Sequence, residues 1–82
     1  MRDLLRTKRY VALRSILKDA RETLGLSQGQ VAARIGRPQT YISDIETGVR
    51  RIDSIEFLRI AKALKLDPGE VMIRVNKVQD RS

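Results

Sequence analysis

Residues 24–48 read LGLSQGQVAARIGRPQTYISDIETG and carry the pattern of two short helices joined by a tight turn. Ser27 is a favourable helix N-cap because its hydroxyl can accept hydrogen bonds from the free amides of the first turn. Apolar side chains then recur at helical spacing, and Gly36 stands where a helix ends in the left-handed backbone region. Only residues 36–38 separate this helix from the next. So short a link forces the two helices to cross steeply.

The segment after the turn, which we expect to be helical over residues 39–47, separates polar from apolar side chains. Ile42 and Ile45 lie on one face, and small or polar residues occupy the other face at spacings i, i+1, i+4 and i+5. These polar residues are Gln39, Thr40, Ser43 and Asp44. A glutamine can pair with N6 and N7 of adenine at once, and a threonine can contact a thymine methyl group or a base edge. The pattern favours a helix-turn-helix that places its second helix in the major groove of DNA, with an ordinary solvated helix face as the alternative.

The charge balance favours a polyanionic partner. Seventeen Lys and Arg residues against ten Asp and Glu residues leave a formal net charge of +7 on 82 residues. A surplus of this size attracts nucleic acid through counterion release. On charge alone, a surplus of positive charge that only keeps the protein in solution is an equally good explanation. The helix-turn-helix pattern favours a nucleic-acid partner over this explanation.

Composition excludes most enzymatic and metal chemistry. The chain has no cysteine and no histidine, so it lacks thiolate nucleophiles, disulfides, the usual metal ligand and the usual proton shuttle. We therefore expect no catalysis, no cofactor, no metal and no small-molecule ligand. Residues 1–9 are charged and the apolar runs are short, so we expect no signal peptide, no membrane span and a cytoplasmic location.

We expect one domain made of helices. Residues 1–9 are expected to form a basic N-terminal extension or the first turn of the first helix, residues 10–75 the helical domain, and residues 76–82 a polar tail. The expected helices cover residues 10–24, 28–35, 39–47, 53–64 and 68–75. Asp53 followed by Glu56 predicts a capping box, and Asp67 before Pro68, with Glu70, repeats this pattern.

Apolar residues at helical spacing predict the inward face of each helix. In the first helix these residues are Leu13, Ile16, Leu17, Ala20 and Leu24. In the fourth helix they are Ile55, Leu58, Ala61 or Ile60, and Leu64. The fifth helix region carries more apolar residues than one short helix needs, namely Leu66, Val71, Met72, Ile73 and Val75. We expect some of them to pack under the first helix and the rest to form a homodimer face, unless all belong to the core.

These features resemble the helix-turn-helix of the phage-repressor/Cro-like family, often called Xre-type regulators. The matching positions are Leu24-Gly25-Leu26-Ser27-Gln28, Ala32, Gly36, Ile42-Ser43, Ile45-Glu46 and Gly48. Residues 58–64 resemble the fourth helix of the family, so the resemblance covers residues 13–72. It implies an all-α fold, a compact five-helix bundle of the lambda-repressor-like type, with the second and third helices as the reading unit.

The resemblance also implies roles for individual residues. The implied base readers are Gln39, Thr40 and Asp44. Gln28 is implied to touch the phosphate backbone and to brace Gln39, and the alternative is an ordinary solvated polar residue at a helix start. Arg21 and Glu46 are implied to pair across the first and third helices and so to orient the reading helix.

Polar residues around the reading helix are expected to bind the DNA backbone. They are Gln28, Arg37, Tyr41, Ser43, Arg50 and Arg51. Tyr41 is large enough to reach backbone oxygens, and it is also the right size to pack against the first or fourth helix. Arg50 and Arg51 follow the reading helix in a loop, where guanidinium groups can clamp a phosphate, although a charge pair in a loop is usually only solvated.

Two positions depart from the family pattern. An acidic group at Asp44 repels phosphates, so this side chain either accepts a hydrogen bond from cytosine N4 or pairs with a neighbouring arginine. Arg37 and Pro38 stand where members of the family often carry Ser or Thr. Proline fixes the backbone for a helix start but supplies no side-chain cap.

We interpret the chain as a sequence-specific transcriptional regulator that binds double-stranded DNA, as a homodimer on a palindromic operator. A stand-alone regulator, a restriction–modification controller and a phage Cro-like repressor fit this interpretation equally well. An antitoxin that also binds a toxin protein is an alternative, although residues 76–82 are short for a partner-binding segment. An RNA-binding module is a third class, against which the low aromatic content argues.

Overall fold

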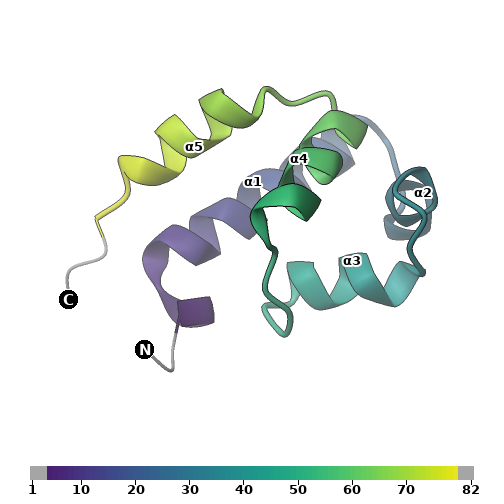
Figure 1. Cartoon of the computed structure of the whole chain (residues 1–82), viewed down its shortest axis with the longest axis horizontal. Coiled ribbons are helices and arrows are strands. Elements are labelled where there is room, and N and C mark those ends of the chain that lie inside the picture. Colours follow the sequence, from purple (N-terminus) through teal and green to yellow (C-terminus); the bar gives the residue numbers. More distant parts are fainter. Residues whose placement is uncertain (1–3, 80–82) are drawn as a thin grey trace.

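The computed structural model describes residues 4–79, and these residues form one turn of 3₁₀-helix, Leu4–Arg6, and five α-helices. The helices are α1 (Lys8–Thr23), α2 (Gln28–Arg34), α3 (Gln39–Glu46), α4 (Ser54–Ala63) and α5 (Pro68–Asn76). Within residues 4–79 there is no strand, and the predicted all-α five-helix fold is confirmed. Figure 1 shows α3 and α5 on opposite sides of α1, with α2 at one end of α3.

Side-chain caps explain where four of the α-helices begin, including α4, where the Asp53 side chain accepts from the Glu56 amide. The Ser27 hydroxyl accepts from the Gln30 amide at 3.0 Å, and the Gln30 side chain accepts from the Ser27 amide at 2.8 Å, which closes a capping box at α2. Asp67 accepts from the amide of Gly69 at 2.8 Å, and Pro68 occupies the first turn of α5. Thr7 caps α1, which therefore begins before the predicted residue 10.

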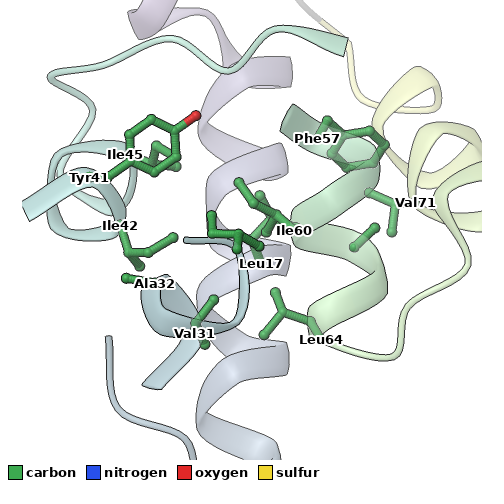
Figure 2. Close-up of a cluster of buried hydrophobic side chains, with 12 residues drawn as sticks. Leu17, Val31, Ala32, Tyr41, Ile42, Ile45, Phe57, Ile60, Leu64 and Val71 are labelled. Atoms are coloured by element: carbon green, nitrogen blue, oxygen red, sulfur yellow. The ribbon is translucent and has the colours of Figure 1, made fainter. Parts of the chain in front are cut away.

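The core is aliphatic and is made by all five α-helices (Figure 2). Its buried members are Leu17, Val31, Ala32, Ile35, Tyr41, Ile42, Ile45, Phe57, Ile60, Ala61, Leu64 and Val71. Each large aliphatic side chain removed from water contributes about 1.5–3 kcal/mol before the entropy of folding is counted. Among the residues predicted inward in α1, Leu17 is buried and Leu24 is exposed.

The inward face of α4 differs from the prediction. Ile55 and Leu58 were expected inside, but the structure leaves them 65% and 48% exposed. Glu56 and Phe57 are buried instead, while Ile60, Ala61 and Leu64 are buried as predicted. Both stripes satisfy helical spacing, and the burial of Phe57 beside Val71 of α5 selects between them (Figure 2).

Helix α1 begins earlier and helix α5 ends later than predicted. Lys8 and Arg9 belong to the first turn of α1, which is the alternative to an extension that was left open for residues 1–9. The Arg9 guanidinium donates to the carbonyl oxygens of Asn76 at 3.1 Å and Val78 at 3.0 Å, which joins the start of α1 to the end of α5. Asn76, assigned to the tail, closes α5. The predicted extension and tail also include residues 1–3 and 80–82, which lie outside the described residues.

Side chains of α1 hold the loop between α3 and α4. The Tyr10 hydroxyl accepts a hydrogen bond from the Ile52 amide. Gly48 has a φ of +83°, and a Cβ placed there would lie 2.9 Å from the guanidinium carbon of Arg14. Only glycine adopts this backbone without strain. The loop that carries Arg50 and Arg51 therefore follows a defined path beside α3.

No helix in residues 4–79 is long and apolar enough to cross a membrane.

Two isoleucines of α4 test which face of this helix is buried. Ile60→Ala should lower the free energy of unfolding by about 2–5 kcal/mol, because it leaves a cavity in the core. Ile55→Ala makes the same chemical change on the same helix and should alter the free energy by less than about 0.5 kcal/mol, because Ile55 is solvated. Urea unfolding followed by circular dichroism measures both, and equal losses would contradict this orientation of α4.

Candidate nucleic-acid interface

The turn between α2 and α3 fixes where α3 starts. Gly36 adopts a φ of +69°, and the Arg37 amide donates to the Ala32 carbonyl at 2.9 Å, so the chain reverses in the left-handed conformation predicted for it. Pro38 is the N-cap of α3 and makes no side-chain cap, as its residue type predicts. Helix α3 therefore begins at Gln39, the predicted residue.

Helix α3 presents its polar face outward. Ile42 and Ile45 are buried in the core on one side of the helix. Gln39 and Thr40 on the other side are exposed, and Ser43 and Asp44 are half-buried. This division agrees with the predicted amphipathic pattern and leaves the four polar residues accessible from outside the protein.

A largely buried ion pair orients α3 against α1. The Arg21 Nε and Nη2 atoms donate to the two Glu46 carboxylate oxygens at 2.7 and 3.0 Å, a two-pronged contact. The Arg21 side chain is 12% exposed and that of Glu46 6%. Hydrogen bonding to Glu46 raises the pKa of Arg21 and outweighs the opposing effect of burial. The implied Arg21–Glu46 pair is confirmed.

The Glu46 carboxylate also holds Gln39, the first residue of α3, through the side chain of Gln28. Gln28 donates from Nε2 to Glu46 Oε1 at 2.9 Å, and its Oε1 accepts from Gln39 Nε2 at 3.2 Å. The predicted bracing of Gln39 by Gln28 is confirmed. An amide nitrogen has two hydrogens, so Gln39 keeps one donor and its carbonyl oxygen for an adenine edge.

Tyr41 lies inside the protein, although it was expected at the DNA backbone. Its side chain is buried, and its hydroxyl donates to Glu56 Oε1 at 3.1 Å. Burial and this hydrogen bond raise the pKa of Tyr41. Because the hydroxyl is used within the protein, the structure favours the packing alternative for Tyr41 over a direct phosphate contact.

Glu56 is a second buried carboxylate, and the sequence analysis missed its main role. Its backbone amide does bond to Asp53 as predicted, but its carboxylate accepts from Arg37 Nη2 at 3.2 Å and Arg59 Nη1 at 3.1 Å. Burial alone would raise the pKa of Glu56, and the hydrogen bonds from Arg37 and Tyr41 outweigh it and lower the pKa. The sequence offered one signal of this role, because Glu56 stands four residues before Ile60 on the apolar stripe.

The arginines around α3 differ in their partners. Arg37 pairs with Glu56, and both Arg37 and Arg50 place their guanidinium groups over the Tyr41 ring. Arg51 is exposed in the same loop as Arg50. Asp44 forms no ion pair with any residue from 4 to 79, so its salt-bridge alternative finds no partner there.

Among the described residues, no group of three or more His, Cys, Asp or Glu side chains is arranged to hold a metal ion. The surface around α3 is instead built from amides, hydroxyls and guanidinium groups, which are the groups that contact base edges and phosphates in protein–DNA complexes.

Removing Arg21 tests how strongly the ion pair holds α3. Arg21→Met leaves Glu46 buried without its cation and should lower the free energy of unfolding by about 3–5 kcal/mol. Glu22→Gln removes only an exposed contact with Arg21, measured at 3.9 Å between Nη2 and Oε2, and should cost less than about 1 kcal/mol. Chemical unfolding of both variants gives the comparison. A small loss for Arg21→Met would show that the pair is dispensable.

Comparison with known proteins identifies a family and related sequences that this chain resembles. The sequence model of the family described as helix-turn-helix matches residues 17–71. Over 60 residues, the chain is 33% identical to the uncharacterized HTH-type transcriptional regulator MT0491 of Mycobacterium tuberculosis (strain CDC 1551 / Oshkosh). That match covers 73% of this chain and 43% of the relative. The chain thus spans less than half the length of the curated relatives that it matches.

Solved structures agree in fold and, in two cases, in sequence. An XRE-family like protein from Pseudomonas syringae pv. tomato str. DC3000 superposes with a TM-score of 0.79 at 38% identity, over 83% of each chain. The restriction-modification controller protein C.AhdI from Aeromonas hydrophila gives 0.69 at 31% identity, over 76% of this chain and 90% of that one. The clp gene regulator ClgR from C. glutamicum gives 0.74 at 22% identity, over 83% of this chain and 88% of that one, and shows the fold alone. With a family match over most of its length and a similar fold and sequence in a solved XRE-family like protein, this chain belongs to the helix-turn-helix family of the Xre type.

Proposed function

We propose that this chain is a sequence-specific transcriptional regulator that inserts α3 into the major groove of double-stranded DNA. The observation that carries the proposal is the outward polar face of α3, whose first residue, Gln39, is held in place by Gln28 and Glu46. A base-reading side chain that is already ordered loses less conformational freedom on binding. The net charge of +7 supports a DNA partner.

In this proposal, the residues around α3 divide between bases and backbone. The base readers are Gln39, Thr40 and Asp44. The phosphate contacts come from Gln28, Ser43, Arg50 and Arg51, whereas Arg37, also expected at the backbone, stays paired with Glu56. Asp44 has no ion-pair partner among residues 4–79, which leaves its carboxylate available to accept from cytosine N4. The names of the curated relatives support a regulatory role, as HTH-type transcriptional regulators.

We further propose that the chain binds DNA as a homodimer through the outer face of α4 and α5. An apolar groove there is lined by Phe57, Leu58, Pro68 and Met72. Among the residues expected at the dimer face, Val71 belongs to the core, and Met72 and Ile73 are exposed. Leu58, expected inside, adds its exposed side chain to the groove. Figure 1 shows α5 on the far side of α1 from α3, so pairing there leaves the polar face of α3 uncovered.

A two-fold dimer of this kind would bind two half-sites. Equivalent α3 helices about 34 Å apart enter successive major grooves on one side of the duplex and select a palindromic site. Selection of binding sites from random duplexes with the purified chain tests partner type and symmetry together. A palindromic consensus supports the proposal, and recovery of no duplex would overturn it.

Two substitutions separate base reading from phosphate binding. Gln39→Ala should cost about 1–3 kcal/mol of binding free energy and relax selectivity at one base pair, because it removes a base contact. Arg50→Ala should weaken all duplexes alike and reduce the slope of log affinity against log salt by about 1. Fluorescence anisotropy with the selected duplex and its single-base variants measures both effects.

Arg74→Ala is the matched control for charge, since it removes an arginine from α5, on the far side of α1 from α3 (Figure 1). It should leave the base preferences intact and lower affinity less than Arg50→Ala. If all three variants bind every duplex equally well, α3 does not dock as proposed.

A charge in the α4–α5 groove tests the dimer. Leu58→Glu should shift the chain to monomer, because a carboxylate buried between two apolar faces loses its hydration without gaining a partner. Val11→Glu makes a similar change at an exposed position of α1 and should leave dimerisation as it is. Sedimentation equilibrium reports both, and a Leu58→Glu chain that dimerises like the unaltered chain would place the interface elsewhere.

A further inference from the structure

Two arginines from opposite ends of α3 converge on one aromatic ring. Arg37 precedes α3 in the turn, and Arg50 follows it in the loop. Their guanidinium carbons lie 5.0 and 4.8 Å from the centroid of the Tyr41 ring, within the range of cation–π attraction. The ring thus links the two connections that flank the reading helix.

The Tyr41 ring is itself held firmly. Its side chain is 7% exposed, and Figure 2 shows it at the edge of the apolar cluster beside Ile45. The hydroxyl donates to Glu56, and Arg59 holds the same carboxylate at 3.1 Å while donating to the Ile35 carbonyl at 2.7 Å. A side chain fixed at both ends makes a rigid platform for the cations that lie over it.

The two cations differ in what neutralises them. Arg37 forms an ion pair with Glu56 at 3.2 Å. The guanidinium of Arg50 lies over the ring and makes no hydrogen bond or ion pair with any residue in the 4–79 stretch. Glu56 carries one negative charge and already serves Arg37 and Arg59. Of the two cations over the ring, Arg37 therefore has a carboxylate partner and Arg50 has none within residues 4–79.

The backbone beneath Arg50 is also fixed. The amides of Val49 and Arg50 both donate to the Asp44 carbonyl, at 2.9 and 3.1 Å. Asp44 belongs to the outward face of α3, so this bond ties the position of Arg50 to the helix that would enter the groove. With its backbone bonded to α3 and its guanidinium over Tyr41, Arg50 is ordered at both ends of its side chain.

We propose that Tyr41 is a positioning residue that holds the Arg50 guanidinium beside α3 for a DNA phosphate, while Arg37 remains paired with Glu56. The inference rests on the proposed DNA-binding function and deepens it. Tyr41 then contributes to affinity without touching DNA, because a guanidinium held in place loses less freedom when it binds. Arg51, the next residue, does not lie over the ring, so its guanidinium is the comparison that Tyr41 does not position.

A double-mutant cycle between Tyr41 and Arg50 tests the inference. In the unaltered chain, Arg50→Ala should weaken binding to the selected duplex about tenfold, and in a Tyr41→Leu background only about threefold or less, because the positioning is already lost. Arg51→Ala should cost the same factor in both backgrounds. Circular dichroism of each variant gives the folded fraction by which the affinities are corrected.

Two further variants keep the test independent of damage to the core. Tyr41→Phe retains the ring and loses only the hydroxyl, so the loss on Arg50→Ala should return to that seen in the unaltered chain. Arg50→Lys keeps the charge but not the planar guanidinium, and should weaken binding more than Arg51→Lys does. The second pair alters only exposed side chains and does not depend on the stability of Tyr41→Leu.

The outcomes distinguish this inference from the function on which it rests. Equal losses on Arg50→Ala in the unaltered, Tyr41→Phe and Tyr41→Leu backgrounds would show that Tyr41 does not position Arg50, while DNA binding itself would stand. Equal effects of Arg50→Lys and Arg51→Lys would show the same. Failure of the unaltered chain to bind any duplex would instead overturn the proposed function, and this inference with it.

Discussion

The carboxylate of Glu46 is the constraint on which the arrangement of the reading helix depends. It lies in α3, it is nearly buried, and it accepts hydrogen bonds from Arg21 of α1 and Gln28 of α2. A buried charge that loses its partners is costly, so helices that share one carboxylate can move relative to each other only by breaking those bonds. These bonds hold α2 and α3, which the short turn joins, in one relative orientation. Through Gln28 they also fix the position of Gln39.

A second buried carboxylate, Glu56, also holds α3. It belongs to α4, and it joins this helix to Tyr41 in α3 and to Arg37 in the preceding turn. Helix α3 is therefore anchored to α1 and α2 through its own carboxylate, and to α4 through that of Glu56. Apolar packing of Ile42 and Ile45 buries the helix, but it is non-directional, and the hydrogen bonds supply the orientation.

The parts of the site that could be predicted are those set by neighbours in sequence. The helix start at Gln39 follows from Gly36 and Pro38, and the outward polar face follows from the spacing of two isoleucines. The Arg21–Glu46 pair came from resemblance to a family and not from the residues alone. Tyr41 could not be assigned, because a tyrosine in that position suits either a phosphate or a core, and the nearby Glu56 that decides the matter comes from another helix.

The sequence by itself determined the five helices, the tight turn and the amphipathic character of α3, because caps, left-handed glycines and periodicity act over a few residues. Only the tertiary structure decided which stripe of α4 is buried. Two stripes had the right spacing. The stripe that contains Phe57 is buried because Phe57 packs with the rest of the core, and Ile55 and Leu58 are left exposed. It also decided that Arg37 is neutralised while Arg50 is not, since that difference depends on the distance of each guanidinium from a carboxylate distant in the chain.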